Sequence, residues 1–95
     1  MAVKVILKRK VPRGKEKDLL PLLLELRTQA MRQPGYISGE TLRSVTSPED
    51  LLVIGTWQTK EAWEQWASSK QRAEIQEKID SLLGEKTEYS IYYYG

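Results

Sequence analysis

The side chains of this chain that could do chemistry are aromatic rings, hydroxyls, arginines and carboxylates. Its 95 residues include three tryptophans and five tyrosines, but no histidine, no cysteine and no asparagine. A Ser-His-Asp triad, a cysteine nucleophile, a histidine general base and a Cys/His metal site are therefore excluded. No pair of carboxylates stands at a spacing typical of an acid and base couple, so hydrolase chemistry has no support.

Trp66 is the best single candidate for ligand contact. Its indole could stack on a flat aromatic molecule or donate its Nε1–H group to a ligand oxygen. Aromatic residues at helical spacing, as Trp63 and Trp66 are, more often fill a core. Tyr36 and Arg43 could polarise a quinone or phenolate oxygen beside a cavity. The alternative is that Tyr36 packs its ring with the hydroxyl in water and that Arg43 is an exposed strand residue.

Charge and hydropathy give no sign of a nucleic-acid or membrane partner. The net charge is +2, and no apolar run approaches the roughly 20 residues of a membrane span. No signal peptide is evident, so a cytoplasmic location is expected. The central parts of the sheet, residues 3–7 and 52–55, have no aromatic side chain on which a base could stack. A basic run is expected to be solvated: Lys4, Lys8, Arg9, Lys10, Arg13, Lys15 and Lys17.

Hydrophobic periodicity predicts the elements that must position these residues. Alternating apolar positions predict strands over residues 3–11, 36–45, 51–57 and 87–94. Apolar residues at three- and four-residue spacing predict one helix before Gln33. They predict further helical segments from Thr59, an N-cap, and from a capping box of Ser68 and Gln71.

This order predicts a single α+β domain over residues 1–95, with a ferredoxin-like βαββαβ arrangement. Right-handed crossovers place the helices on one face of a four-stranded antiparallel sheet. The strand 51–57 is apolar on both faces, so the uncovered face favours a homodimer sealed sheet to sheet. Glu40 would lie near a cavity only if the face it shares with Ser38 and Leu42 is the helix side, and the sequence leaves that open.

Two segments resemble one known family. Residues 33–42, with Gln33-Pro34-Gly35-Tyr36, and residues 53–66, with Thr56-Trp57 followed by two tryptophans, are similar to the antibiotic biosynthesis monooxygenase domain. The resemblance implies a dimeric α+β barrel with a cavity between helices and sheet in each subunit. It also implies chemistry: some members oxidise aromatic polyketides or quinols with O2 and no metal or flavin, and others degrade haem.

The haem-degrading members are a poor match. Their iron-ligating histidine aligns with Gln76, their catalytic asparagine has no counterpart, and only their active-site tryptophan matches, at Trp66. Gln76, beside Ile75 and Ile79, could also reach a pocket. We therefore expect a cofactor-independent monooxygenase acting on a flat aromatic or quinol molecule, with no metal. The alternative is a non-enzymatic dimeric module of the same fold that binds a small ligand or serves a stress response.

Overall fold

The computed structural model describes all 95 residues, Met1–Gly95, and contains four strands and three helices. In chain order these are β1 (Val3–Lys10), α1 (Glu16–Met31), β2 (Tyr36–Arg43), β3 (Asp50–Trp57), α2 (Lys60–Ala67), α3 (Lys70–Leu83) and β4 (Glu88–Tyr93). The predicted α+β order is confirmed. None of the helices has the length and apolar content that crossing a membrane requires.

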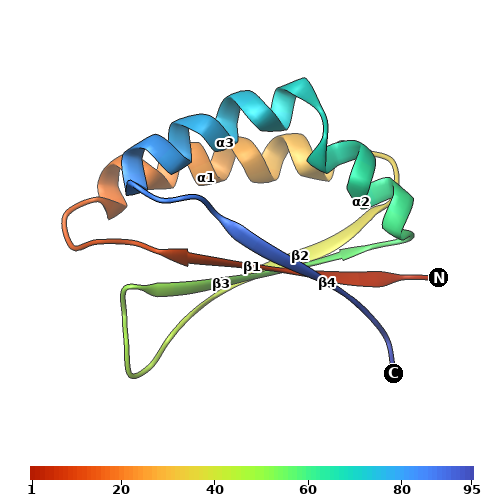
Figure 1. Ribbon diagram of the computed structural model, residues 1–95, viewed down its shortest axis with the longest axis horizontal. Coiled ribbons are helices and arrows are strands. Elements are labelled where there is room, and N and C mark those ends of the chain that lie inside the picture. The colour runs from red at the N-terminus through yellow and green to blue at the C-terminus, as the bar shows by residue number, and fades with distance from the viewer.

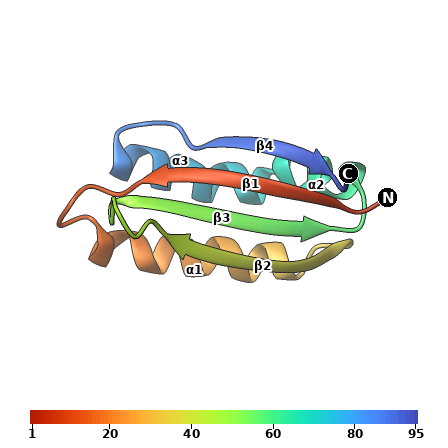
Figure 2. The same cartoon turned by 90° about the horizontal axis from the view of Figure 1, so that it is seen from below.

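The strands form one antiparallel sheet in the order β2-β3-β1-β4 (Figure 2). All three helices lie on the same side of it, with α1 and α3 side by side (Figure 1). The odd-numbered residues of β1 face the helices and are buried, and Val3, Val5 and Leu7 form one core cluster with Trp57, Trp63 and Trp66. Because side chains alternate between the two faces of a strand, only the odd-numbered residues of β1 can reach a space between the helices and the sheet.

The opposite face of the sheet is bare of helices. Glu40 is paired with Ile54, and Ile54 with Ile6, so these three side chains share a row. Because the alternate residues of β1 face the helices, this row faces outward, and Glu40 lies on the open face. The same face carries Leu42, 46% exposed, and Tyr92, 53% exposed.

Strand β2 is shorter than predicted: it ends at Arg43 rather than at residue 45. The Ser44 N–H donates to the carbonyl of Asp50, and the Ser44 hydroxyl accepts from the Ser47 N–H. These bonds close the turn between β2 and β3, and Val45, beyond the last sheet residue, is 97% exposed. A serine that can bond its own turn ends the strand there.

Helix capping follows the predicted residue types with one shift of position. The Thr59 hydroxyl accepts from the Ala62 N–H, as an N-cap of α2 should. The cap of α3 is Ser69, whose hydroxyl accepts from the Arg72 N–H, and not the predicted Ser68. The Ser68 hydroxyl is bonded to the last turn of α2 instead.

The turn before β2 explains why the two family-like segments occur together. Gly35 has a φ of +89°, which side chains rarely adopt, and a Cβ there would lie 2.5 Å from the Cβ of Ala62. Its carbonyl accepts from the Gln58 N–H at 2.7 Å. Only glycine lets this turn lie so close to the start of α2.

Candidate functional site

A cavity of about 480 Å³ lies between α1, the sheet and the start of α3. Two glycines of neighbouring strands lie in its floor, Gly39 of β2 paired with Gly55 of β3, and the Tyr36 hydroxyl and the Trp57 indole lie over them. Leucines of α1 form the opposite wall: Leu20, Leu23, Leu24 and Leu26. The volume falls within the roughly 300–1,000 Å³ of small-molecule sites.

Aromatic rings from three elements close one end of the cavity. Trp57 contacts the edges of Tyr36 and Trp63, with ring centroids 5.4 and 5.8 Å apart. Trp66 is 3% exposed and belongs both to the hydrophobic core and to the cavity wall. Trp66 is therefore a core residue that also borders the cavity, and its contact with a ligand stays a prediction.

The Tyr36 hydroxyl extends along β2 over Gly39. A Cβ on Gly39 would lie 2.7 Å from the Tyr36 Oη atom, so the missing side chain makes room for the phenol. Tyr36 lines the cavity and has no hydrogen-bond partner within the chain for this hydroxyl. The hydroxyl is placed as a group that could contact a ligand oxygen.

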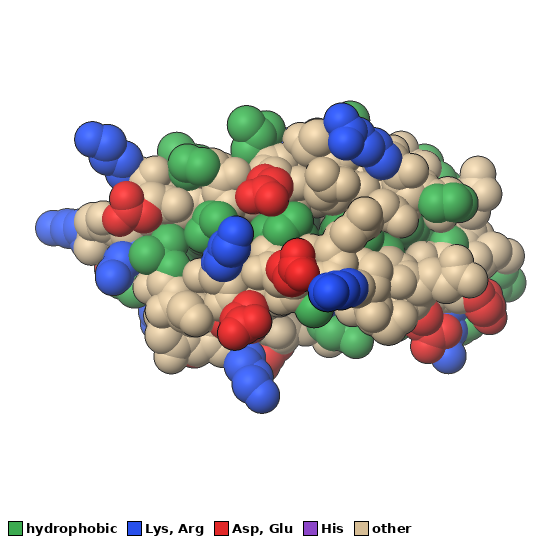
Figure 3. Space-filling model, turned by 90° about the horizontal axis from the view of Figure 1, so that it is seen from above, with side chains coloured by type: hydrophobic (Ala, Val, Ile, Leu, Met, Phe, Trp, Pro, Cys, Tyr) green, Lys and Arg blue, Asp and Glu red, His purple; other side chains and the backbone are tan.

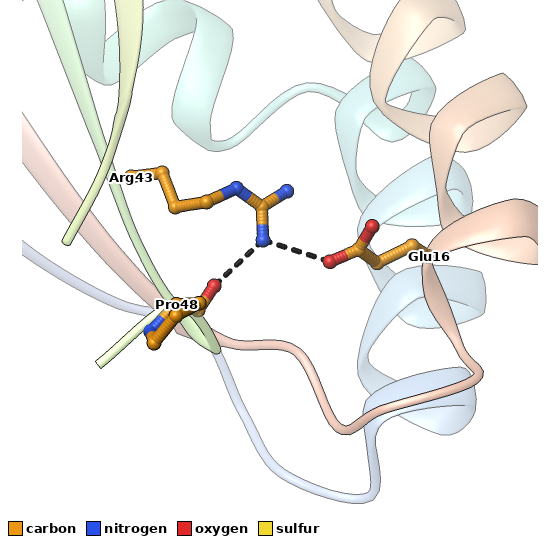
Figure 4. A network of polar contacts seen from close by, with 3 residues as sticks. All are labelled: Glu16, Arg43 and Pro48. Carbon is orange, nitrogen blue, oxygen red and sulfur yellow. Dashed lines mark hydrogen bonds and ion pairs between the residues drawn. The ribbon is translucent and has the colours of Figure 1, made fainter. Parts of the chain in front are cut away.

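Arg43 lies at the other end of β2, where the cavity meets the surface. Its Nη1 donates to Glu16 Oε1 at 2.7 Å and to the carbonyl of Pro48 at 2.6 Å (Figure 4). The Arg43 and Glu16 side chains are 46% and 51% exposed. Arg43 borders the cavity, but its guanidinium ties the turn between β2 and β3 to the start of α1.

Two arginines that the sequence analysis did not select also line the cavity. Arg9 of β1 is 6% exposed and Arg72 of α3 is 8% exposed. The expectation that Arg9 belongs to a solvated basic run was wrong, because Arg9 has the same parity as the buried residues of β1. Arg72 precedes Ile75 and Ile79 by three and seven residues, which places it on the buried stripe of α3.

Burial makes both guanidinium groups weaker bases than usual. Desolvation, and then the charge of Arg72, lower the pKa of Arg9 to about 10, although Asp80 opposes the shift. Desolvation lowers the pKa of Arg72 too, against the opposing effects of Tyr89 and Asp80. Both groups remain cations at neutral pH, so the cavity wall carries positive charge.

Gln76 is buried beneath β4 and is not part of the cavity wall. Its Nε2 donates to Asp80 Oδ1 and to Thr87 Oγ1, both at 2.8 Å. Its Oε1 accepts from Arg9 Nη2 at 3.5 Å. Gln76 therefore holds Arg9 in place from behind rather than meeting a ligand.

A second hollow of about 530 Å³ lies beside the loop that precedes β4. Side chains of both charges line it, Lys8 and Glu88 among them, and Arg9 and Arg43 border both spaces. Charged and hydrophobic side chains are also interspersed on the helical face of the molecule (Figure 3). No group of three or more acidic side chains gathers as a metal ion would need.

Comparison with known proteins gives one family and a set of similar folds. The sequence model described as antibiotic biosynthesis monooxygenase matches residues 2–78. No curated protein matches the chain. A conserved protein from Methanosarcina mazei Go1 has a similar structure, with a TM-score of 0.90 and 23% identity over 100% of this chain and 94% of that one.

Two further solved structures are similar. SnoaB, a cofactor-independent oxygenase from Streptomyces nogalater, has a TM-score of 0.86 and 15% identity, over 99% of this chain and 93% of SnoaB. Rv0793 from Mycobacterium tuberculosis has a TM-score of 0.85 and 16% identity, over 100% of this chain and 96% of that one. At these identities the likeness is one of fold.

Proposed function

Because this chain belongs to the antibiotic biosynthesis monooxygenase family, we propose that it oxidises a flat, electron-rich aromatic molecule, such as a quinol or an anthrone, with O2 and without metal or flavin. The observation that carries the proposal is a cavity lined both by aromatic rings and by two buried arginines. SnoaB, which has a similar fold, is described as a cofactor-independent oxygenase.

The cavity suits a flat ligand. The indole of Trp66 and the edge-packed rings of Tyr36 and Trp57 offer aromatic surface, and leucines of α1 offer apolar surface opposite them. Aromatic contacts of this kind contribute about 0.5–1.5 kcal/mol each beyond the burial of area. A ligand held there loses water from both of its faces.

The reaction needs a substrate that can act as the electron donor. An anthrone loses a methylene proton, and its negative charge spreads onto the ring oxygen. The Tyr36 hydroxyl and the positive field of the two arginines favour that anion. The electron pair then forms a carbon–oxygen bond to O2, protonation gives a hydroperoxide, and cleavage of the O–O bond releases water and leaves a carbonyl. One oxygen atom enters the product and the other leaves as water.

No side chain in the cavity is placed as a strong base. Glu40 is the one carboxylate at its edge, and Glu40 lies on the open face of the sheet. In the proposed reaction the proton therefore passes to water. The same observation favours a second candidate function, in which the cavity binds an aromatic ligand without converting it.

Oxygen uptake separates the two candidate functions. Wild-type protein should accelerate O2 consumption by a hydroxylated anthrone, and Trp66→Phe should slow it, since an aromatic contact of about 0.5–1.5 kcal/mol is weakened. The same change should lower the free energy of unfolding by about 1–3 kcal/mol, because Trp66 is also core. Tyr94→Phe, an exposed aromatic outside the cavity, is the control. A wild type that consumes no O2 with any quinol or anthrone would refute catalysis and leave ligand binding.

We also propose that the chain forms a homodimer through the open face of its sheet. Ile6 and Ile54 meet there in one row, with Leu42 and Tyr92 about half exposed beside them. Contiguous apolar surface of this kind favours association. Light scattering at micromolar concentration should give about twice the 11.0 kDa of one chain. A folded species of single-chain mass would contradict the proposal.

A further inference from the structure

Four aromatic rings form a continuous series that starts in the cavity. Tyr36 contacts Trp57, and Trp57 contacts Trp63, with ring centroids 5.4 and 5.8 Å apart. Trp63 in turn contacts Tyr89, with centroids 5.3 Å apart. Each pair meets edge to face at a separation typical of rings in direct contact. Electron transfer between rings weakens steeply as the gap between them widens, so a series without gaps is a favourable path for electrons.

The two ends of this aromatic series lie in different surroundings. Tyr36, Trp57 and Trp63 line the cavity, whereas Tyr89 lies outside it. Trp57 and Trp63 are 2% and 3% exposed. Tyr89 belongs to the edge strand β4 and is 47% exposed. The series therefore connects the space of the proposed oxidation with solvent.

Trp63 has one feature that packing does not explain. Its Nε1 donor is buried without a hydrogen-bond partner, although buried polar groups are normally bonded. An oxidised indole gives up its N–H proton where an acceptor is present, and the neutral radical that remains is a weaker oxidant. Because Trp63 has no such acceptor, its oxidised form keeps the proton. It thereby stays able to oxidise a neighbouring phenol.

The guanidinium of Arg72 favours transfer away from Trp63. Its central carbon lies 5.3 Å from the ring centre of Trp63 and 5.9 Å from that of Tyr89. Like charges repel, so this cation disfavours a positive charge that stays on the indole of Trp63. A phenol loses its proton when it is oxidised and becomes a neutral radical, so Tyr89 avoids the repulsion. Tyr89 is also exposed to water, which accepts the proton.

We propose that Trp63 and Tyr89 form a protective electron relay, which reduces oxygen-centred radicals formed in the cavity. The inference rests on the proposed function for the source of these radicals, which are peroxyl or alkoxyl radicals of the substrate. One electron passes from the indole of Trp63 to the radical. The radical takes up a proton from water and becomes a hydroperoxide or an alcohol. Where Trp57 gives the electron instead, Trp63 replaces it.

The electron that Trp63 loses is restored from Tyr89. The phenol of Tyr89 gives one electron to the indole and one proton to water, and a neutral tyrosyl radical remains at the surface. A reductant in solution, such as ascorbate or a thiol, then returns one hydrogen atom to this radical. The oxidised site is thus moved from the wall of the cavity to an exposed side chain that solution reductants can reach.

Flash photolysis tests the relay without any ligand, because an ultraviolet pulse ionises tryptophan inside the protein. A Tyr36→Phe background removes the other phenol of the series. In that background we expect tryptophan radicals to decay into tyrosyl radicals at a rate independent of protein concentration. Adding Tyr89→Phe should slow this decay at least about tenfold. Adding Tyr92→Phe is the matched control and should leave the rate unchanged, because Tyr92 is 53% exposed on the same strand but outside the series.

A second pair of variants tests the ring between Trp57 and Tyr89. Trp63→Phe should lower the share of tryptophan radicals that become tyrosyl radicals, because phenylalanine is too difficult to oxidise to carry the charge. Trp66→Phe is the matched control: Trp66 is equally buried on the same helix, at 3% exposure, but lies outside the series. It should not lower that share. Near-ultraviolet circular dichroism checks that each variant is folded.

The outcomes distinguish the relay from the proposed function. Equal decay rates in the Tyr89 and Tyr92 variants would overturn the relay, and so would equal losses in the Trp63 and Trp66 variants. A rate that rises with protein concentration would overturn it too, because the transfer would then run between molecules. The photolysis uses neither substrate nor O2. A working relay in a protein that oxidises no quinol or anthrone would therefore show that the proposed function alone is wrong.

Discussion

Replacing Arg9 with methionine should make the protein more stable, because the natural residue is a buried cation without a counter-charge. Arg9 is 6% exposed, and burial together with Arg72 lowers its pKa to about 10. At about 1.4 kcal/mol per pKa unit, keeping the group charged in the folded protein costs about 3 kcal/mol. Methionine is apolar, flexible and able to fill the space of the side chain.

Two losses reduce this gain. The hydrogen bond from Arg9 to Gln76 is long, at 3.5 Å, and a typical bond contributes about 1 kcal/mol. The repacked methionine also gives up part of the contacts that the guanidinium makes. A net increase of about 1–3 kcal/mol in the free energy of unfolding is therefore expected, in the range seen when buried ions are replaced by apolar residues.

The pH dependence has a definite sign. Folding lowers the pKa of this cation, so the folded state releases the proton at a lower pH than the unfolded state does. The destabilisation is fully present below pH 10 and is relieved as the pH rises through about 10. A comparison at pH 7 therefore measures the whole effect.

The assay is thermal unfolding of wild type and Arg9→Met at one fixed protein concentration, since association shifts the melting temperature. Each kcal/mol should raise Tm by roughly 4–8 °C in a domain of this size. Arg13→Met, at an exposed position, should stay within about 0.5 kcal/mol of wild type. A lower Tm for Arg9→Met would refute the view that Arg9 is an uncompensated charge.

Three further predictions follow from the packing of the site. Gly39→Ala places a Cβ 2.7 Å from the Tyr36 hydroxyl and should lower the free energy of unfolding by about 1–3 kcal/mol. The loss should be much smaller in a Tyr36→Phe background, which lacks the hydroxyl. Equal losses in both backgrounds, measured by urea unfolding, would contradict the packing described. Arg43→Gln removes an ion pair with Glu16 that is about half exposed and should lower the free energy of unfolding by at most about 1 kcal/mol. A larger loss in the same measurement would show that this ion pair stabilises the fold more than exposed pairs do. Titration with haem should give no stoichiometric, sharply shifted Soret band, since Gln76 stands at the aligned ligand position with its amide bonded inside the chain; such a band with turnover of the haem would disprove this.

The order of elements could be predicted from sequence because burial and period agree along most of the chain. The structure contains the strand β1 that the alternating apolar residues indicate and the helix α2 that the spacing of the tryptophans indicates. A glycine, Gly84, follows the last residue of α3. The boundaries were less predictable. Strand β2 ends two residues early because Ser44 is hydrogen-bonded within the turn that follows it. Helix α3 is capped by Ser69 and not by the adjacent Ser68.

The candidate site could be predicted only in part. At Arg9 and Arg72 the residue type indicates solvent exposure, whereas the position in the apolar pattern indicates burial. Arg9 follows Val3, Val5 and Leu7 with the same parity, so its position indicates burial, whereas its charge indicates solvent. Arg72 repeats the conflict on the stripe of α3. A basic side chain in an apolar pattern was the signal available for both, and it was outweighed by the general preference of arginine for the surface. Gln76 is also buried because it lies on the inner side of α3. Its amide donates to Asp80, which lies one turn further along the same helix.

The features that lower stability in this fold gather in one place. Gly39 and Gly55 leave the sheet without side chains where α1 crosses it, and Arg9 and Arg72 bring unpaired charge to the same space. Selection for stability alone would replace the unpaired charges, because a single substitution removes each of them. In the proposed function the hollow holds a flat ring system, and the two arginines add a positive field beside it. Their coincidence in one cavity therefore argues for a bound ligand more strongly than either feature does separately.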